Sequence, residues 1–184
     1  MNRIYITDQE VQGMTLDILR QMQRDRWQPD YIVGLTRGGL VPANLISQYL
    51  DVPMHTLKIS LRDSDGGESN LWMAEEAFGY VPSEQREVIN SRWDPHFKKK
   101  ILVVDDINDS GATLDWLRED WQSGCLPDET NAWNRVWNNN VRFAVLVDNT
   151  ASQLGVKIDY TAREINKAED PSWIVFPWED WWKR

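Results

Sequence analysis

The chain contains 184 residues, with 29 acidic and 20 basic side chains that give a formal net charge of −9, and its length fits one domain or one domain with a sizeable insertion. The acidic balance, without any run of Lys or Arg, counts against nucleic acid as a partner and disfavours anionic membrane surfaces. No apolar stretch approaches the ~18 residues that a bilayer span needs, and the N-terminus lacks the apolar core of a signal peptide, so we expect a cytoplasmic protein with no membrane partner.

The first predicted elements are a helix, a strand and a second helix. Thr7 and Glu10 form a capping box, and apolar residues then recur at helical spacing, which predicts a helix over residues 8–26. Residues 31–35 are a short run rich in β-formers and predict a strand. A glycine turn follows, and residues 41–50 again have helical periodicity.

The next stretch of the chain contains a strand and a long irregular segment. Residues 55–61 predict the strand, and residues 62–98 then lose periodicity. A segment of that length inside a compact domain is usually a lid or a disordered insertion. We expect it to close over a site and exclude water, with its first contacts at Ser60, Arg62 and Asp63.

The second half of the chain continues the alternation of strands and helices. Residues 101–104 predict a buried strand, and a helix begins near Ala112. Residues 119–140 are predicted to be an excursion, after which residues 142–147 and 157–162 predict further strands. This order predicts an α/β fold with a mostly parallel sheet flanked by helices, in which ligands collect at the carboxyl ends of the strands.

The cysteine, histidine and tryptophan residues limit the disulfides, metal sites and aromatic contacts that the chain can form. Cys125 is the only cysteine, which excludes an internal disulfide and any multi-cysteine metal site. His55 and His96 lie too far apart in sequence to suggest a metal pair. Several of the 11 tryptophans crowd into residues 116–137 and 173–182, where they can cap a core, stack on a planar ligand or form an oligomer contact.

The segment ILVVDDINDSGATL, residues 101–114, carries the densest group of ligand-type side chains. A hydrophobic strand leads to two adjacent carboxylates, and a glycine-containing loop follows at the start of a helix. The backbone N–H groups of such a loop bind phosphate, and the carboxylates can accept hydrogen bonds from ribose or help hold Mg²⁺ through water. The alternative is an acidic turn that merely caps the next helix. The candidate residues are Asp105, Asp106, Asp109, Ser110, Gly111, Ala112 and Thr113.

This segment resembles the phosphoribosyl pyrophosphate (PRPP) signature of the type I phosphoribosyltransferases, with Ser in place of the usual Thr at position 110. Upstream, IVGLTRGGLVPANLI resembles the family's pyrophosphate loop, in which an Arg and exposed amides neutralise the departing diphosphate. The residues that match this loop are Thr36, Arg37, Gly38 and Gly39. The two matches imply a type I phosphoribosyltransferase fold over residues 1–184, with a small hood built from the terminal segments.

A third motif, PSWIVFPWE over residues 171–179, is similar to the C-terminal signature of the xanthine/guanine/hypoxanthine branch of that family. The resemblance implies that Trp173 stacks on the purine and that the backbone of Ile174 contacts the edge of the base. The alternative is a hydrophobic closure of the domain. We expect this closure role for the other aromatic residues of the segment, namely Phe176, Trp178, Trp181 and Trp182.

One position departs from the pattern of that branch. There, the strand after the PRPP motif ends with a lysine that contacts the 6-oxo group of the base, whereas Asp148 or Asn149 occupies the place here. A carboxylate cannot donate a hydrogen bond to a carbonyl oxygen. Either another donor takes over, with Lys157 and Lys167 as candidates, or the base is not a 6-oxopurine. We expect both lysines to be solvated surface residues.

The resemblance implies Mg²⁺-dependent transfer of a 5-phosphoribosyl group from PRPP to a ring nitrogen of a purine-like nucleobase, in nucleotide salvage. Arg37 would stabilise the leaving diphosphate, Asp109 would accept the proton of the base nitrogen, and Asp105 and Asp106 would hold the metal. We also expect a homodimer or higher homo-oligomer. The alternatives are a non-catalytic PRPP- or nucleotide-binding regulator, and transfer to a pyrimidine or another acceptor.

Overall fold

A five-stranded parallel sheet forms the centre of the computed structural model, which describes residues 2–59, 70–81, 83–85, 92–125 and 131–183. All neighbouring strands run parallel. In spatial order the strands are β3 (Met54–Lys58), β2 (Tyr31–Thr36), β4 (Ile101–Asn108), β5 (Val141–Asn149) and β6 (Tyr160–Ile165). The predicted α/β class with a mostly parallel sheet is confirmed.

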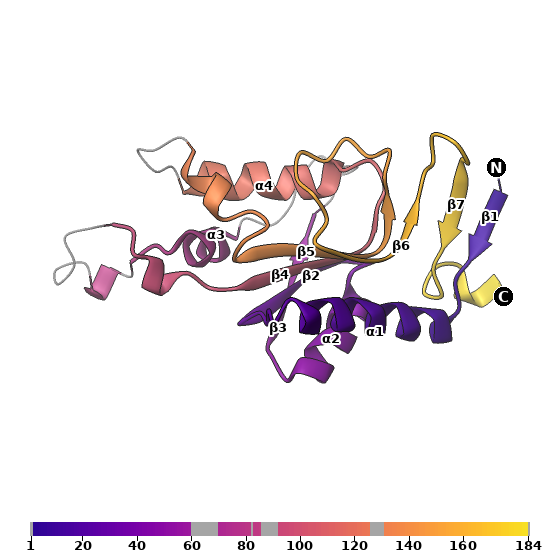
Figure 1. The fold of residues 1–184 in the computed structure, drawn as a ribbon, viewed down its shortest axis with the longest axis horizontal. Helices are drawn as coiled ribbons and strands as arrows, with labels where there is room; N and C mark the ends of the chain where they lie inside the picture. Colours follow the sequence, from indigo (N-terminus) through magenta and orange to yellow (C-terminus); the bar gives the residue numbers. More distant parts are fainter. Residues whose placement is uncertain (1, 60–69, 82, 86–91, 126–130, 184) are drawn as a thin grey trace.

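Helices cover both faces of this sheet (Figure 1). One layer contains α1 (Asp8–Arg24) and α2 (Leu40–Leu50), and the other contains α3 (Leu71–Phe78) and α4 (Ala112–Gly124). Successive strand side chains point to opposite faces, so β4 contributes Leu102 and Val104 to the first layer and Ile101 and Val103 to the second. Burial on both faces explains why β4 is continuously hydrophobic before its carboxylates. No helix among the described residues is long and apolar enough to cross a bilayer.

The capping box at the start of α1 forms as predicted. The Thr7 hydroxyl accepts a hydrogen bond from the Glu10 N–H at 3.1 Å, and the Glu10 carboxylate accepts one from the Thr7 N–H at 2.8 Å. The helix ends at Arg24, two residues before the predicted end, because Arg26 has a left-handed backbone with φ of 52°. Helix ends commonly differ by one or two residues from a sequence-based estimate.

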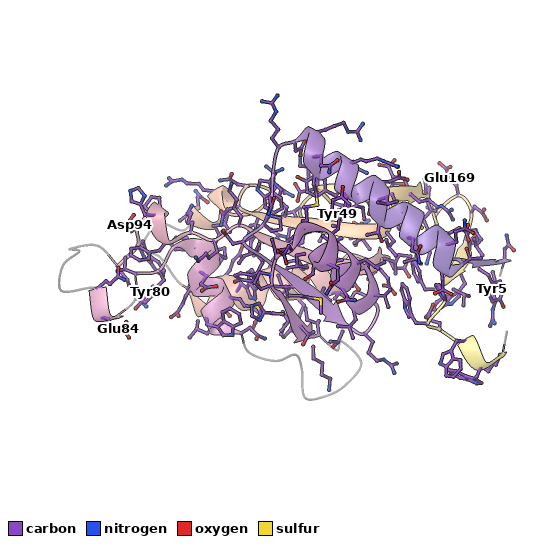
Figure 2. The ribbon with its side chains drawn as sticks, turned by 90° about the horizontal axis from the view of Figure 1, so that it is seen from below. Tyr5, Tyr49, Tyr80, Glu84, Asp94 and Glu169 are labelled. Atoms are coloured by element: carbon purple, nitrogen blue, oxygen red, sulfur yellow. The ribbon has the colours of Figure 1, made fainter. Side chains whose placement is uncertain are left out.

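The two termini meet in a separate small sheet. β1 (Asn2–Tyr5) pairs in parallel with β7 (Ser172–Val175), with Ile4 opposite Ile174. This sheet lies beside β6 at one end of the molecule (Figure 1). Figure 2 shows Tyr5 of β1 and Glu169, in the connection from β6 to β7, at this same end, opposite Glu84 and Asp94. The terminal segments therefore form the expected small hood beside the main sheet.

The long segment 62–98 is not uniformly irregular. Residues 71–78 form α3, which buries Met73, Ala74 and Ala77 and ends at Gly79, where φ is 87°. The absence of periodicity expected for residues 62–98 is therefore wrong for this helix, because a helix of two turns is too short to display a repeat. The expected lid contacts Ser60, Arg62 and Asp63 lie outside the described residues.

The predicted excursion over residues 119–140 starts too early, because α4 continues to Gly124. Its aromatic residues belong to the core beneath α3 and α4. The ring of Trp137 stacks on those of Trp133 and Trp121 at 5.1 and 6.1 Å between centroids. Cys125 is buried beside them, and its carbonyl accepts a hydrogen bond from Trp133 Nε1 at 2.8 Å. Of the three roles considered for the tryptophans, the structure shows a core role for this group.

Candidate active site

The loop after β2 lies against the acidic end of β4. A Cβ atom added to Gly38 would collide with the Asp106 carboxylate, and one added to Gly39 would collide with the carbonyl oxygen of Val104. Glycine at both positions therefore lets the backbone of this loop approach β4. The Arg37 side chain is exposed and forms no hydrogen bond or ion pair with the described residues, while its backbone carbonyl accepts a hydrogen bond from the Leu40 N–H at 3.2 Å. Its guanidinium is free to meet an anion.

The two carboxylates lie inside β4, which extends through them to Asn108 rather than ending at Val104 as predicted. Burial raises the pKa of Asp105 well above its ordinary value, and the neighbouring Asp106 charge adds to the rise. Burial, followed by the charge of Glu179, raises the pKa of Asp106 to about 6. Strongly shifted carboxyls at the carboxyl end of a parallel sheet are typical of functional sites.

Trp178 offsets part of the rise in the pKa of Asp106. The Trp178 indole N–H lowers the pKa of Asp106, although Trp178 Nε1 has no partner at hydrogen-bonding geometry within the described part of the chain. A bound cation or hydroxyl donor would stabilise the charged form of both aspartates.

The raised pKa of Asp106 makes stability depend on pH. Its ordinary pKa is 3.8, so the unfolded chain releases this proton first, and ionisation destabilises the folded state as the pH rises from about 4 to about 6. We expect Asp106→Asn to raise the free energy of unfolding at about pH 7.5 by about 1 kcal/mol or more, which is about 2–4 °C in Tm. The gain should shrink towards pH 4, where the wild-type carboxyl is protonated.

Thermal melts at both pH values measure this effect. Asp170→Asn, which neutralises an exposed carboxylate, is the matched control and should change Tm little. A variant of Asp106 that melts at or below the wild-type temperature at about pH 7.5 would show that this charge does not destabilise the fold.

The loop between β4 and α4 forms a cradle at a helix N-terminus. Gly111 precedes α4 with φ of 90°, and a Cβ atom there would meet Leu154 N at 2.5 Å. The Ser110 hydroxyl accepts a hydrogen bond from the Ala112 N–H at 3.3 Å, and Thr113 lies in the first turn of the helix. A cavity of about 210 Å³ is lined by this loop and by Asp105 and Asp106. Its N–H groups and hydroxyls suit a phosphate.

A second cavity of about 260 Å³ adjoins the first on the side of the hood. Asp106, Ile107 and Asp109 line both cavities. The other residues that line the second cavity are Lys167, Trp173, Ile174, Phe176 and Glu179. Trp173 is 43% exposed, while Ile174 is buried on the opposite side of β7. Asp109 thus stands between an anion cradle and an aromatic pocket.

Lys167 is not the solvated surface residue that we expected. Its side chain is only 17% exposed, and Nζ lies 2.8 Å from Asp109 Oδ1 and 5.6 Å from the ring centroid of Trp173. Lys157 is exposed, as predicted, and its carbonyl accepts a hydrogen bond from Asn138, which precedes β5 at the opposite end of the sheet. The connection from β6 to β7 brings Lys167, and not Lys157, to the candidate site.

The residues at the place of the expected lysine have separate roles. Asp148 accepts a hydrogen bond from Asn108 Nδ2 at 2.8 Å. Asn149 is buried, donates from Nδ2 to the Asp109 carbonyl at 2.8 Å, and accepts at Oδ1 from the Lys167 N–H at 3.0 Å. Sequence reasoning missed Glu179 and the contacts of Lys167 and Asn149 with Asp109, because contacts between residues so far apart along the chain leave no local pattern.

The aromatic C-terminal segment closes the domain only in part. Phe176 is buried and stacks on Trp178 with 5.0 Å between ring centroids, as a closing residue should. Trp181 and Trp182 are 67% and 65% exposed, so the closure role expected for these two residues is wrong. They follow Asp180, whose left-handed backbone directs the short C-terminal turn away from the core.

The acidic residues that the structure describes do not form a self-sufficient metal site. Among the described residues, no group of three or more His, Cys, Asp or Glu side chains is placed to hold a metal ion. Mg²⁺ usually keeps several waters and binds through one or two carboxylates together with substrate phosphates. Asp105 and Asp106 fit that mode. A larger groove of about 700 Å³ lies along α1, but none of the candidate residues lines it.

Known proteins resemble this chain in sequence and in fold. The family described as "Phosphoribosyl transferase domain" matches residues 4–180. Xanthine phosphoribosyltransferase 1 of Saccharomyces cerevisiae is 22% identical over 198 residues, which cover 96% of this chain and 90% of the yeast protein. A xanthine-guanine phosphoribosyltransferase of Cereibacter sphaeroides is 37% identical over 87 residues, 47% of this chain and 44% of the relative.

A solved structure matches over nearly the whole chain. The xanthine-guanine-hypoxanthine phosphoribosyltransferase of Helicobacter pylori is 21% identical, and the match covers 99% of this chain and 97% of that one with a TM-score of 0.64. At this level of identity the match shows that the two proteins share a fold.

Proposed function

The chain belongs to the phosphoribosyl transferase domain family, and on that premise we propose that it transfers a 5-phosphoribosyl group from PRPP to a purine-like nucleobase in nucleotide salvage, releasing diphosphate. The names of the relatives, which are xanthine and xanthine-guanine phosphoribosyltransferases, support a purine as the acceptor. The observation that carries the proposal is the pair of adjoining cavities that share Asp109. One suits a sugar phosphate, and the other suits a planar ring.

The mechanism that we propose is electrostatic. As the bond between ribose C1 and the diphosphate lengthens, negative charge develops on the leaving group, which Arg37 and exposed amides of the loop after β2 stabilise. The β4–α4 loop holds the 5-phosphate, and Asp105 and Asp106 accept hydrogen bonds from the ribose hydroxyls. Asp109, at the border of the two cavities, accepts the proton that the base nitrogen loses.

Mg²⁺ is the cofactor that we propose. The charged forms of Asp105 and Asp106 are destabilised by burial and by neighbouring carboxylates, so a cation beside them would offset an unfavourable charge. The two carboxylates would hold water ligands of the ion, with PRPP oxygens completing its shell. When bound, Mg²⁺ supplies positive charge to the leaving diphosphate.

Trp173 is the stacking platform that we propose for the base. We expect Trp173→Ala to raise KM for the base about 5- to 150-fold, since stacking contributes about 1–3 kcal/mol in nucleobase sites. KM for PRPP should change little, because PRPP has no ring to stack. Steady-state kinetics with each substrate varied in turn measures KM for the base and KM for PRPP separately. Trp182→Ala, which removes an exposed ring in the same terminal segment, is the control. A larger effect on PRPP than on the base would contradict the assignment.

A PRPP-binding regulator is the second candidate that the same cavities allow. The exposed, unpaired Arg37 and the position of Asp109 favour catalysis, because binding alone requires neither a general base nor a group aimed at the leaving diphosphate. Diphosphate release that requires both PRPP and a base separates the two candidates.

A further inference from the structure

We propose, on the premise of the function above, that Lys167 reads the base by donating a hydrogen bond to a carbonyl oxygen on the edge of a heterocycle stacked on Trp173. Lys167 is the only basic side chain among the described residues that line the second cavity. The other charged groups there are the carboxylates of Asp106, Asp109 and Glu179, which accept hydrogen bonds but cannot donate when ionised.

The position of the ammonium suits this role. Nζ lies over the Trp173 ring, 5.6 Å from its centroid, so a planar ring that stacks on this tryptophan, offset from the ammonium, has its edge beside Nζ. The ammonium has three donors, and the ion pair with Asp109 Oδ1 uses one of them. The remaining donors are available to an oxygen of the base.

Asn149 acts as a positioning residue for this pair. Its buried amide holds the backbone of both partners, because Nδ2 donates to the Asp109 carbonyl and Oδ1 accepts from the Lys167 N–H. These two contacts tie the loop after β4 to the connection between β6 and β7. The residue at the end of β5 therefore orients the cation instead of supplying it.

The ion pair with Asp109 explains why a partly buried cation is tolerated here. A lysine side chain that is only 17% exposed loses hydration, and the Asp109 carboxylate at 2.8 Å compensates for part of that loss. The ion pair fixes the ammonium at the border of the two cavities before any ligand binds. Recognition of a carbonyl then needs little reorganisation.

The test varies the ligand and the protein together. Hypoxanthine and unsubstituted purine share the same ring system, but only hypoxanthine carries the 6-oxo group. We expect the wild type to have a higher kcat/KM for hypoxanthine than for purine. Lys167→Met should lower the ratio of these two kcat/KM values about 10- to 100-fold, because a hydrogen bond to a charged donor discriminates by that order. Lys167→Arg, which keeps a cation, should retain part of the preference. KM for PRPP should change by less than about 3-fold in both variants.

Lys157→Met is the matched control, since it removes an exposed ammonium at the opposite end of the sheet. It should leave the ratio unchanged. Melting curves identify any variant that fails to fold. If Lys167→Met does not fold, the ratio of the wild type is compared with that of Lys167→Arg instead. A wild-type enzyme without preference for hypoxanthine, or Lys167→Met with the wild-type ratio, would overturn the assignment while leaving phosphoribosyl transfer intact. A wild type that turns over no base would instead contradict the proposed function.

Discussion

Asp109→Asn should lower kcat about 10²- to 10⁴-fold while leaving the affinity for PRPP close to that of the wild type, because general-base assistance contributes a factor of that size. Asn keeps the shape of the side chain and the backbone contact in which Asn149 donates to the carbonyl of residue 109. It removes the carboxylate that faces both cavities. The loss should therefore appear in turnover, not in PRPP binding.

Calorimetry with PRPP and Mg²⁺, together with steady-state kinetics, measures the two effects separately. The substitution also breaks the ion pair with Lys167, so Lys167→Met provides the comparison. If loss of the ion pair caused the defect, the two variants would lose the same kcat. Asp170→Asn, at an exposed carboxylate, should behave as wild type. A parallel fall in affinity and rate would assign Asp109 to ligand binding, and full activity would remove it from the mechanism.

Arg37→Ala should lower kcat about 10²- to 10³-fold, the effect of removing a group aimed at charge that develops in the transition state. The backbone of the loop is fixed by the close approach of Gly38 to Asp106 and of Gly39 to Val104, so truncation of the exposed Arg37 side chain should leave its geometry intact. Loss of rate with an unchanged melting temperature is the expected signature.

Arg20→Ala is the control for net charge, because Arg20 is 65% exposed on α1 and pairs only with Asp17 among the described residues. Its kcat should stay within about 2-fold of the wild type, as expected for a surface charge far from the site. Arg37→Lys should recover part of the loss, since a lysine supplies charge without the planar fork of a guanidinium. An Arg37→Ala enzyme with wild-type kcat would show that the diphosphate is stabilised by other groups.

Local sequence patterns were sufficient for most of the fold. The capping box placed the start of α1, and the apolar run of β4 with its carboxylates located the acidic end of the sheet, because helix capping and strand burial depend on residues that are close in sequence. The elements that were missed are short. α3 has two turns and β1 and β7 have four residues each, so none of them repeats a pattern.

The site was predictable where one segment or one family motif carries it. The loop after β4, the loop after β2 and Trp173 all belong to contiguous motifs, and the structure brings them to one end of the sheet. Lys167 and Asn149 were not predictable as partners of Asp109, because they reach it through tertiary contacts across 40 or more residues. The departure from the family pattern at Asp148 or Asn149 left open whether another donor replaces the family's lysine, and the fold alone showed that Lys167, and not Lys157, lies at the candidate site.

The most direct test of phosphoribosyl transfer is identification of the products formed from PRPP, Mg²⁺ and a panel of bases containing xanthine, guanine, hypoxanthine, adenine and uracil. We expect mass spectrometry to show a nucleoside 5′-monophosphate of at least one 6-oxopurine, with diphosphate in equal amount, and neither product when the base is omitted. Tight PRPP binding without product from any base would contradict transfer and identify a regulator. A nucleotide of uracil alone would contradict the purine assignment.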